Sequence, residues 1–171
     1  MLNIFNRLFI FLFYSIIILK SPIVWSSDLE KIKKIDSVIS LNKIILLDYN
    51  KNPVDFIDKE TDFYILNFWA SWCAPCRAEH KYLMNLKRNA KNLKLIGINF
   101  KDEKKNANKF LSEFGDPYHY SAADSEGKVS INFGVYGIPE SILVNNDLKI
   151  IKKFIGPLNQ DEYTSILNLT N

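Results

Sequence analysis

The stretch Leu66-Asn-Phe-Trp-Ala-Ser-Trp-Cys-Ala-Pro-Cys-Arg-Ala-Glu-His80 decides the fold, because it joins an apolar run to a helical pattern through a pair of cysteines. The run spans Phe63–Trp69, and its length and composition are typical of a buried strand. From Pro75 to about Asn92, apolar residues at helical spacing alternate with charged ones, which predicts a helix. The two cysteines therefore lie where a strand ends and a helix begins.

Downstream of the cysteines the pattern continues as alternating strands and helices. Leu93–Asn99 is a second apolar run, so strand, helix and strand form a βαβ unit with parallel strands and a right-handed crossover. Asp102–Phe114 predicts a further helix, which ends at Gly115 and Pro117. Another helix is expected from about Glu126 to Phe133.

The C-terminal part predicts an antiparallel hairpin and a closing helix. The hairpin joins Ser141–Asn145 to Leu148–Ile155 through a turn at Asn146-Asp147, and the lysines of its second strand predict a sheet edge. A helix over Asp161–Leu169 follows. The whole order indicates an α/β fold with a central mixed sheet flanked by helices.

The N-terminal 27 residues predict export. Arg7 precedes twelve uncharged residues, Leu8–Leu19, and Lys20 follows, which is the pattern of a secretory signal. Either a cleavage near Ser26 or an uncleaved membrane anchor fits this segment, and both place the body outside the cytoplasm. A buried N-terminal core helix is disfavoured, because the segment has no polar face.

Residues 28–61 predict an approach segment before the main domain at 62–171. Asp28–Lys43 has apolar residues at helical spacing, which predicts an amphipathic helix. Lys43–Tyr49 and Val54–Phe56, separated by Asn50-Lys-Asn-Pro53, predict a short hairpin.

The Cys-Ala-Pro-Cys segment predicts thiol chemistry. A thiolate on Cys73 would lie at a helix N-terminus, where free backbone N–H groups lower its pKa, so Cys73 is the expected nucleophile. Cys76 lies one turn later, within reach of a mixed disulfide, and is the expected resolving thiol. A zinc site would need four ligands, and only His80 and His119 are available besides the pair. A purely structural disulfide would close too short a loop to constrain the chain.

Composition narrows the function classes. The chain has 171 residues, of which 47% are apolar and 24% charged, and this excludes a disordered or fibrous protein. A net charge of +3 with no basic face argues against nucleic-acid binding. Two cysteines are too few for a disulfide scaffold.

A second candidate region is Gly134-Val-Tyr-Gly-Ile-Pro-Glu140, directly before a predicted strand. Pro139 follows the β-branched Ile138 at this turn, so their peptide bond is a candidate cis bond. An ordinary trans-proline at a strand start is the alternative.

These motifs resemble the thioredoxin superfamily, and more narrowly the DsbE/CcmG-type thiol:disulfide oxidoreductases of cytochrome c biogenesis. The resemblance covers about Asp62 to Pro157 and also includes Gly97–Asp102 and Gly115–Tyr118. It implies a thioredoxin-like fold, a redox-active disulfide between Cys73 and Cys76, and no bound cofactor or metal.

The resemblance also implies roles for individual residues. Pro139 is the expected cis-proline, and Glu79 matches an acidic residue of the family near the thiols. Asn67 stands where thioredoxin has a buried Asp that relays protons, and Asn cannot act as a base, which leaves Glu79 as the candidate. An exposed Glu79 that only suits the helix dipole is the alternative. His80 is interpreted as a helix-surface residue.

Substrate contacts are expected from Trp72, beside Cys73, and from three residues around Pro139: Tyr136, Ile138 and Glu140. For Tyr136, a side chain that simply packs is the alternative. By resemblance the protein is a monomeric periplasmic or membrane-tethered reductase that keeps the haem-attachment cysteines of apocytochrome c reduced. Its expected electron donor is a membrane protein of the DsbD/CcdA type. A TlpA- or ResA-like reductase for other envelope thiol proteins, such as copper-site assembly factors, is an alternative, as are a disulfide-forming oxidant and a metal-carrying or apocytochrome-binding module.

Overall fold

A five-stranded mixed sheet forms the centre of the part that the computed structural model describes, residues 45–58 and 60–171. The predicted leader and amphipathic helix lie outside these residues. No helix of the described part is long and apolar enough to cross a membrane. The elements in chain order are β1 (Phe63–Trp69), α3 (Ala74–Asn89), β2 (Leu93–Phe100), α4 (Lys104–Phe114), β3 (Tyr120–Asp124), α5 (Lys128–Asn132), β4 (Glu140–Asn145), β5 (Ile150–Ile155) and α6 (Gln160–Thr170).

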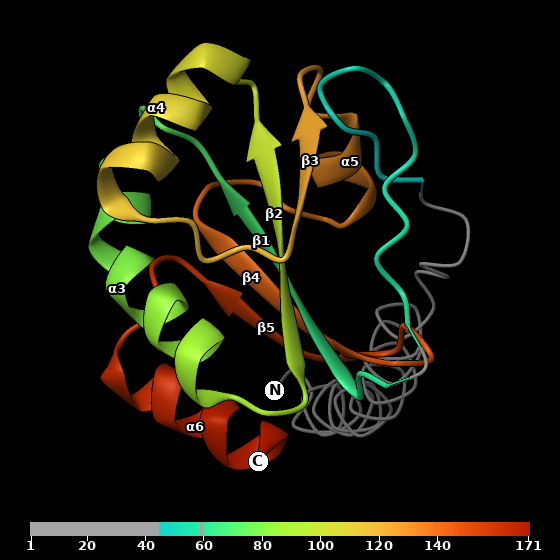
Figure 1. The fold of residues 1–171 in the computed structure, drawn as a ribbon, viewed down its shortest axis with the longest axis vertical. Helices are drawn as coiled ribbons and strands as arrows, with labels where there is room; N and C mark the ends of the chain where they lie inside the picture. Colours follow the sequence, from blue (N-terminus) through green and yellow to red (C-terminus); the bar gives the residue numbers. More distant parts are fainter. Residues whose placement is uncertain (1–44, 59) are drawn as a thin grey trace, which may run out of the picture. The chain divides into compact units, whose positions relative to one another are not determined.

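The strands lie in the order β3-β2-β1-β4-β5, so β1 is central (Figure 1). β1 pairs in parallel with β2, as the predicted βαβ unit requires, and antiparallel with β4. β5 is the predicted edge strand, antiparallel to β4. Because β1 is covered on both faces, six of its seven residues are buried.

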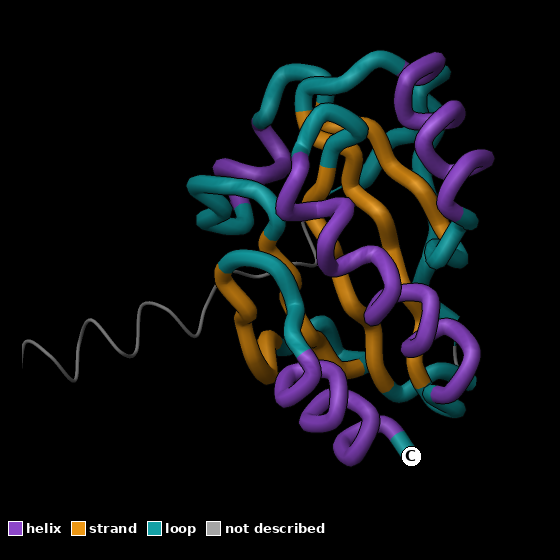
Figure 2. Tube along the Cα trace, turned by 90° about the vertical axis from the view of Figure 1, so that its left-hand side faces the viewer, coloured by secondary structure: helices purple, strands orange, loops and turns teal. Residues whose placement is uncertain are grey.

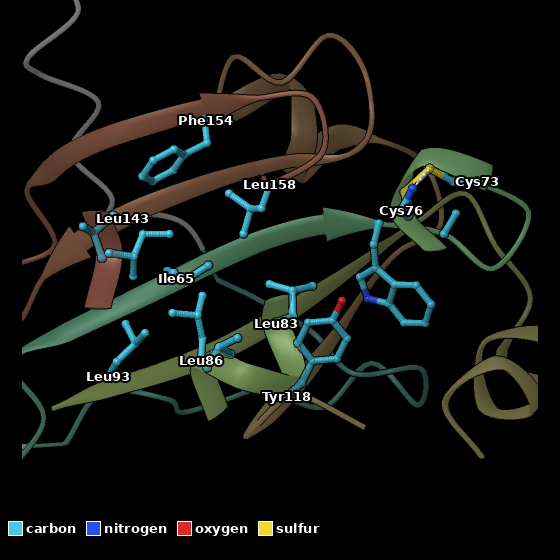
Figure 3. Close-up of a cluster of buried hydrophobic side chains, with 14 of the residues drawn as sticks. Ile65, Cys73, Cys76, Leu83, Leu86, Leu93, Tyr118, Leu143, Phe154 and Leu158 are labelled. Atoms are coloured by element: carbon cyan, nitrogen blue, oxygen red, sulfur yellow. Dashed lines mark hydrogen bonds between the residues drawn. A yellow bond between two sulfur atoms is a disulfide. The ribbon is translucent and has the colours of Figure 1, made fainter. Parts of the chain in front are cut away.

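Helices cover both faces of the sheet. α3, α4 and α6 lie on one face, and Figure 2 looks onto that face. Ile65, Leu95 and Leu143 of the strands pack there against Leu83 and Ile166 of the helices, and the cysteine pair closes one end of this core (Figure 3). The other face packs against α5 and the segment 45–58, with Tyr64, Leu66 and Phe68 at its centre.

The structure corrects three sequence predictions. β3 was not predicted, because Tyr120–Asp124 is short and carries small or polar side chains at a sheet edge. β5 begins at Ile150 rather than Leu148, since Leu148 has φ 59° and belongs to the turn. The predicted N-terminal hairpin is reduced to one antiparallel bridge between Leu47 and Pro53.

α6 begins with a capping box that also fixes the chain entering it. The Asn159 side chain accepts hydrogen bonds from the backbone N–H groups of Asp161 and Glu162, and the Glu162 carboxylate accepts from the Asn159 N–H. This cap holds the preceding residue, Leu158, which is buried against α3. Leu158 therefore lies in the same buried cluster as Cys73 and Cys76.

Candidate active site around the Cys73–Cys76 disulfide

Cys73 and Cys76 form a disulfide at the N-terminus of α3. Cys73 is the N-cap residue, and its Sγ accepts a hydrogen bond from the Cys76 N–H at 3.1 Å. Pro75 lies in the first helical turn, where its missing N–H leaves no hydrogen bond unmade. A sulfur in the N-cap position faces the positive end of the helix dipole, so this geometry favours a thiolate on Cys73 after reduction.

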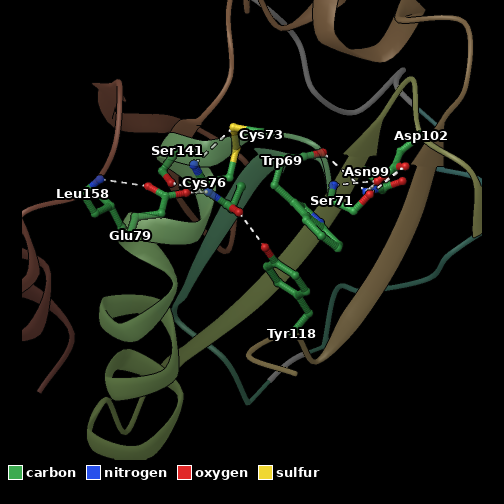
Figure 4. The surroundings of a disulfide bond; sticks show 11 residues. Trp69, Ser71, Cys73, Cys76, Glu79, Asn99, Asp102, Tyr118, Ser141 and Leu158 are labelled. Carbon is green, nitrogen blue, oxygen red and sulfur yellow. Dashed lines mark hydrogen bonds between the residues drawn. A yellow bond between two sulfur atoms is a disulfide. The ribbon is translucent and has the colours of Figure 1, made fainter. Parts of the chain in front are cut away.

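The loop before Cys73 is held by Asp102, which lies between β2 and α4 (Figure 4). Its carboxylate accepts hydrogen bonds from the Ser71 N–H at 2.6 Å and from the Ser71 hydroxyl at 3.0 Å. The Asn99 amide donates to the same carboxylate at 3.2 Å. Asp102 thereby fixes the turn that leads into the disulfide.

Trp72 projects from this fixed turn. Its side chain is 60% exposed, although Cys73 beside it is buried. The indole N–H donates to the Lys101 carbonyl at 3.2 Å, which orients the ring. An oriented, exposed indole next to a reactive sulfur is suited to contact a protein partner.

Glu79 lies below the disulfide on α3 and is fully buried (Figure 4). One carboxylate oxygen accepts from the Asn67 amide at 2.8 Å, and the other accepts from the Leu158 N–H at 2.8 Å. The alternative in which Glu79 is exposed and only suits the helix dipole is therefore wrong. The two contacts bring together β1, α3 and the entry to α6.

Burial raises the pKa of Glu79 from 4.5 to about 7. The hydrogen bonds from Leu158 and Asn67 act in the opposite direction, and the charge of Glu162 raises the pKa further. Glu79 thus exchanges a proton near neutral pH, which suits a general acid or base.

His80 is also buried, which corrects its interpretation as a helix-surface residue. Its Nε2 lies 2.9 Å from the Gly115 carbonyl, and its ring meets Phe110 edge-on. Burial lowers the pKa of His80. The side chain therefore joins α3 to the end of α4 as a core residue.

The Ile138–Pro139 peptide bond is cis, as the sequence pattern predicted. A groove of about 400 Å³ follows this loop and is lined by Tyr136, Ile138, Pro139 and Ile155 among others. Tyr136 is 95% exposed. The groove offers an apolar surface for a partner segment.

The buried Glu140 carboxylate holds the loop before Pro139. One of its oxygens accepts from the N–H groups of Tyr136 and Gly137, at 3.0 and 3.3 Å. The other oxygen pairs with the Lys153 ammonium at 2.9 Å, and Lys153 also donates to the Gly134 carbonyl. Glu140 thus organises the loop, and it also lines the groove with its charge paired to Lys153.

Comparison with known proteins shows which family this chain belongs to. The Redoxin family model matches residues 36–168, which is more than half of the chain. The chain belongs to the Redoxin family. This redoxin is 42% identical over 100 residues to the thiol:disulfide interchange protein HelX of Rhodobacter capsulatus, covering 58% of this chain and 56% of HelX.

Two further similarities extend over more of the chain. The thiol:disulfide interchange protein DsbE of Haemophilus influenzae is 32% identical over 143 residues, covering 81% of this redoxin and 78% of DsbE. The thioredoxin domain of a thiol-disulfide oxidoreductase from Bacteroides vulgatus has a TM-score of 0.63 at 22% identity, over 75% of this chain and 93% of that domain. The latter shows the thioredoxin-like fold. The chain spans about half the length of several curated relatives that it matches, HelX among them.

The described residues contain no group of three or more His, Cys, Asp or Glu side chains placed to bind a metal. Residues that support the site but were not predicted from the sequence include Asp102, Lys153, the backbone of Leu158, and Tyr118, whose hydroxyl donates to Asn67 at 2.7 Å. Asp102 and Tyr118 lie within motifs that carried the family resemblance. These motifs were the signal from which the two residues could have been identified. Nothing local in the sequence marks Lys153 or Leu158.

Proposed function

We propose that this redoxin is a thiol:disulfide oxidoreductase that acts as a protein-disulfide reductase. The observation that carries the proposal is a cysteine pair whose first sulfur caps a helix and whose second lies one helical turn away, above a buried carboxyl that titrates near neutral pH. Cys73 is the nucleophile and Cys76 the resolving thiol. Glu79 is the proton acceptor.

The reaction begins with the reduced pair. The Cys73 thiolate attacks a target disulfide, so that a bond forms between Cys73 and one target sulfur and the other target sulfur leaves as a thiolate. Glu79 then accepts the proton of Cys76, and the Cys76 thiolate attacks Cys73. This step forms the Cys73–Cys76 disulfide and releases the second target thiolate, so that two electrons pass to the target.

The proposed substrate is the haem-attachment cysteine pair of apocytochrome c, on the periplasmic side of the membrane. The family resemblance and the similarity to proteins named for thiol:disulfide interchange support this choice. Residues 1–27 would export or anchor a domain at 62–171, and a membrane dithiol protein of the DsbD/CcdA type would reduce the enzyme again. Trp72, Tyr136 and Ile138 would contact the substrate.

A trapping experiment tests the proposal. A Cys76→Ser variant, expressed with its leader in a cell that makes c-type cytochromes, cannot resolve the mixed disulfide and retains its target on Cys73. Recovery of apocytochrome c or a haem-ligation component is the expected result. A Cys73→Ser/Cys76→Ser variant is the control and should retain nothing. Recovery of copper-assembly proteins or many secreted proteins would overturn the substrate and keep the chemistry.

A further inference from the structure

Asn67 connects Glu79 to a buried tyrosine. Its Oδ1 accepts a hydrogen bond from the Tyr118 hydroxyl at 2.7 Å. Its Nδ2 donates to Glu79 at 2.8 Å and to the Ser141 hydroxyl at 3.0 Å. Since an amide has its acceptor on one side and its donors on the other, a hydroxyl donating to Oδ1 keeps the nitrogen turned toward Glu79.

This orientation determines what the Glu79 carboxyl can do. One carboxylate oxygen accepts a hydrogen bond from the Asn67 amide and the other accepts one from the Leu158 N–H. Neither donor can take up a proton. A proton on Glu79 is therefore not shared with these two partners. The contacts favour the ionised carboxylate, against the burial that favours the neutral acid.

Tyr118 is itself held in place by two neighbours. Its ring stacks on Trp69 with centroids 5.5 Å apart. Gly97 leaves space for the ring, since a Cβ there would lie 2.6 Å from it. Any side chain at position 97 would displace the ring. Gly97 and Trp69 together therefore fix the position of the Tyr118 ring.

We infer that Tyr118 is a positioning residue, which acts through the Asn67 amide to keep one of the two hydrogen-bond donors on Glu79. The inference rests on the proposed role of Glu79 in proton transfer and adds the residues that set it. Beneath the disulfide, Tyr118 and Asn67 then form one hydrogen-bonded unit, in which Trp69 and Gly97 hold the Tyr118 ring.

The other groups that face Glu79 are few. Cys73 and Cys76 lie on the same helix, Glu162 on α6 adds a negative charge, and Tyr118 approaches through Asn67. Within the described residues Glu79 forms no ion pair. Its ionised form therefore depends on hydrogen bonds, which makes the orientation of Asn67 decisive.

Carbon-13 NMR of the Glu side-chain carboxyls tests the inference in the oxidised full chain, where neither cysteine titrates. Comparison with Glu79→Gln identifies the signal. Tyr118→Phe removes the hydroxyl and lets the Asn67 amide turn its oxygen toward Glu79, which favours the neutral acid. The titration midpoint is expected to rise by about one pH unit, the tenfold change in proton affinity that matches the loss of one hydrogen bond to a charged group.

Tyr64→Phe is the matched control. Tyr64 is equally buried and its hydroxyl bonds to the Asp58 backbone, but it lies on the other face of the sheet. The Glu79 midpoint should stay unchanged in this variant. An unchanged midpoint in Tyr118→Phe, or an equal rise in both variants, would overturn the inference.

Asn67→Ala provides a second route and shows whether Tyr118 acts through Asn67. This variant removes the donor itself and should also raise the midpoint. If Tyr118 acts only through Asn67, the double variant Asn67→Ala/Tyr118→Phe has the midpoint of Asn67→Ala alone. Additive shifts would contradict that route. Because the titration needs no thiol exchange, a wild-type protein that exchanges no disulfides would refute the proposed function and leave this result standing.

Discussion

The two sides of the disulfide differ in almost every physical respect. Beneath it, Glu79, Asn67 and Ser141 are fully buried and joined by hydrogen bonds. Trp72, which precedes Cys73, and Tyr136, on the loop before Pro139, form what we call the rim, and they expose 60% and 95% of their surface. Buried polar groups with fixed partners control proton affinity, whereas exposed aromatic side chains provide area for binding. Under the proposed function, the difference teaches that proton transfer and recognition of a partner would use separate side chains.

The rim side chains are exposed, yet the backbone beneath them is fixed. Asp102 holds the turn that carries Trp72, and Glu140 with Lys153 holds the loop that carries Tyr136. A partner would therefore meet an oriented indole and an exposed tyrosine on a fixed loop, with little backbone ordering left to lose. This preorganisation lowers the entropic cost of binding.

The largest expected effect comes from the buried side. Glu79→Gln keeps the shape of the side chain and removes its proton-transfer capacity. Disulfide-exchange rates at pH 7 are expected to fall about 100-fold, toward protein and small-molecule disulfides alike, since general bases contribute by this order. Stopped-flow rates with both substrates measure it. A loss confined to the protein substrate would assign Glu79 to recognition instead.

The same variant also alters the dependence of stability on pH. Because the pKa of Glu79 is raised from 4.5 to about 7, the native state binds more protons than the unfolded state between these values. The free energy of unfolding of the wild type should therefore fall as pH rises through this window, by up to about 3 kcal/mol from this group. Urea unfolding of the oxidised proteins at several pH values should show this slope in the wild type and not in Glu79→Gln.

An intermediate effect is expected at the rim. Trp72→Ala removes exposed aromatic surface without touching the buried network, so KM for a protein disulfide should rise about tenfold while the rate with a small disulfide stays unchanged. Leu169→Ala is the matched control, because Leu169 is 48% exposed on the last turn of α6, beside the start of β2 and away from the disulfide. If both variants raise KM equally, the rim is no special surface.

Contiguous signals explain what the sequence could predict. The strand Phe63–Trp69, the helix after it and the cysteine pair between them are encoded in neighbouring residues, and the structure confirms all three. The cis-proline loop is encoded in the same local way. The secondary structure and the cysteine pair between strand and helix could be predicted because each depends on the pattern of one continuous segment.

Contacts between distant segments explain what the sequence could not predict. Glu79 is buried by Asn67, 12 positions away, and by Leu158, 79 positions away. His80 was placed on the surface because its partner, the Gly115 carbonyl, lies 35 positions along the chain. Burial of a polar residue on a helix depends on which segments pack over it, and no local pattern states that.

The smallest effect is expected from the anchor of the rim loop. Lys153→Met keeps the aliphatic stem and removes the charge that pairs with Glu140, while the N–H groups of Tyr136 and Gly137 still hold that carboxylate. The free energy of unfolding should fall by about 1 kcal/mol, because the pair is partly exposed and only one of its partners is lost.

Kinetic measurements, with a neighbouring lysine as control, distinguish the loss of the Glu140–Lys153 pair from a general effect of removing a charge. The looser loop should raise KM for a protein disulfide about threefold and leave the small-disulfide rate unchanged, an effect of the size of one weak ion pair. Lys152→Met removes the same charge from the adjacent, exposed position on β5 and should change stability by less than about 0.5 kcal/mol. Equal effects of the two variants would mean that the net charge of β5 matters to the partner and that the Glu140–Lys153 pair does not position Tyr136.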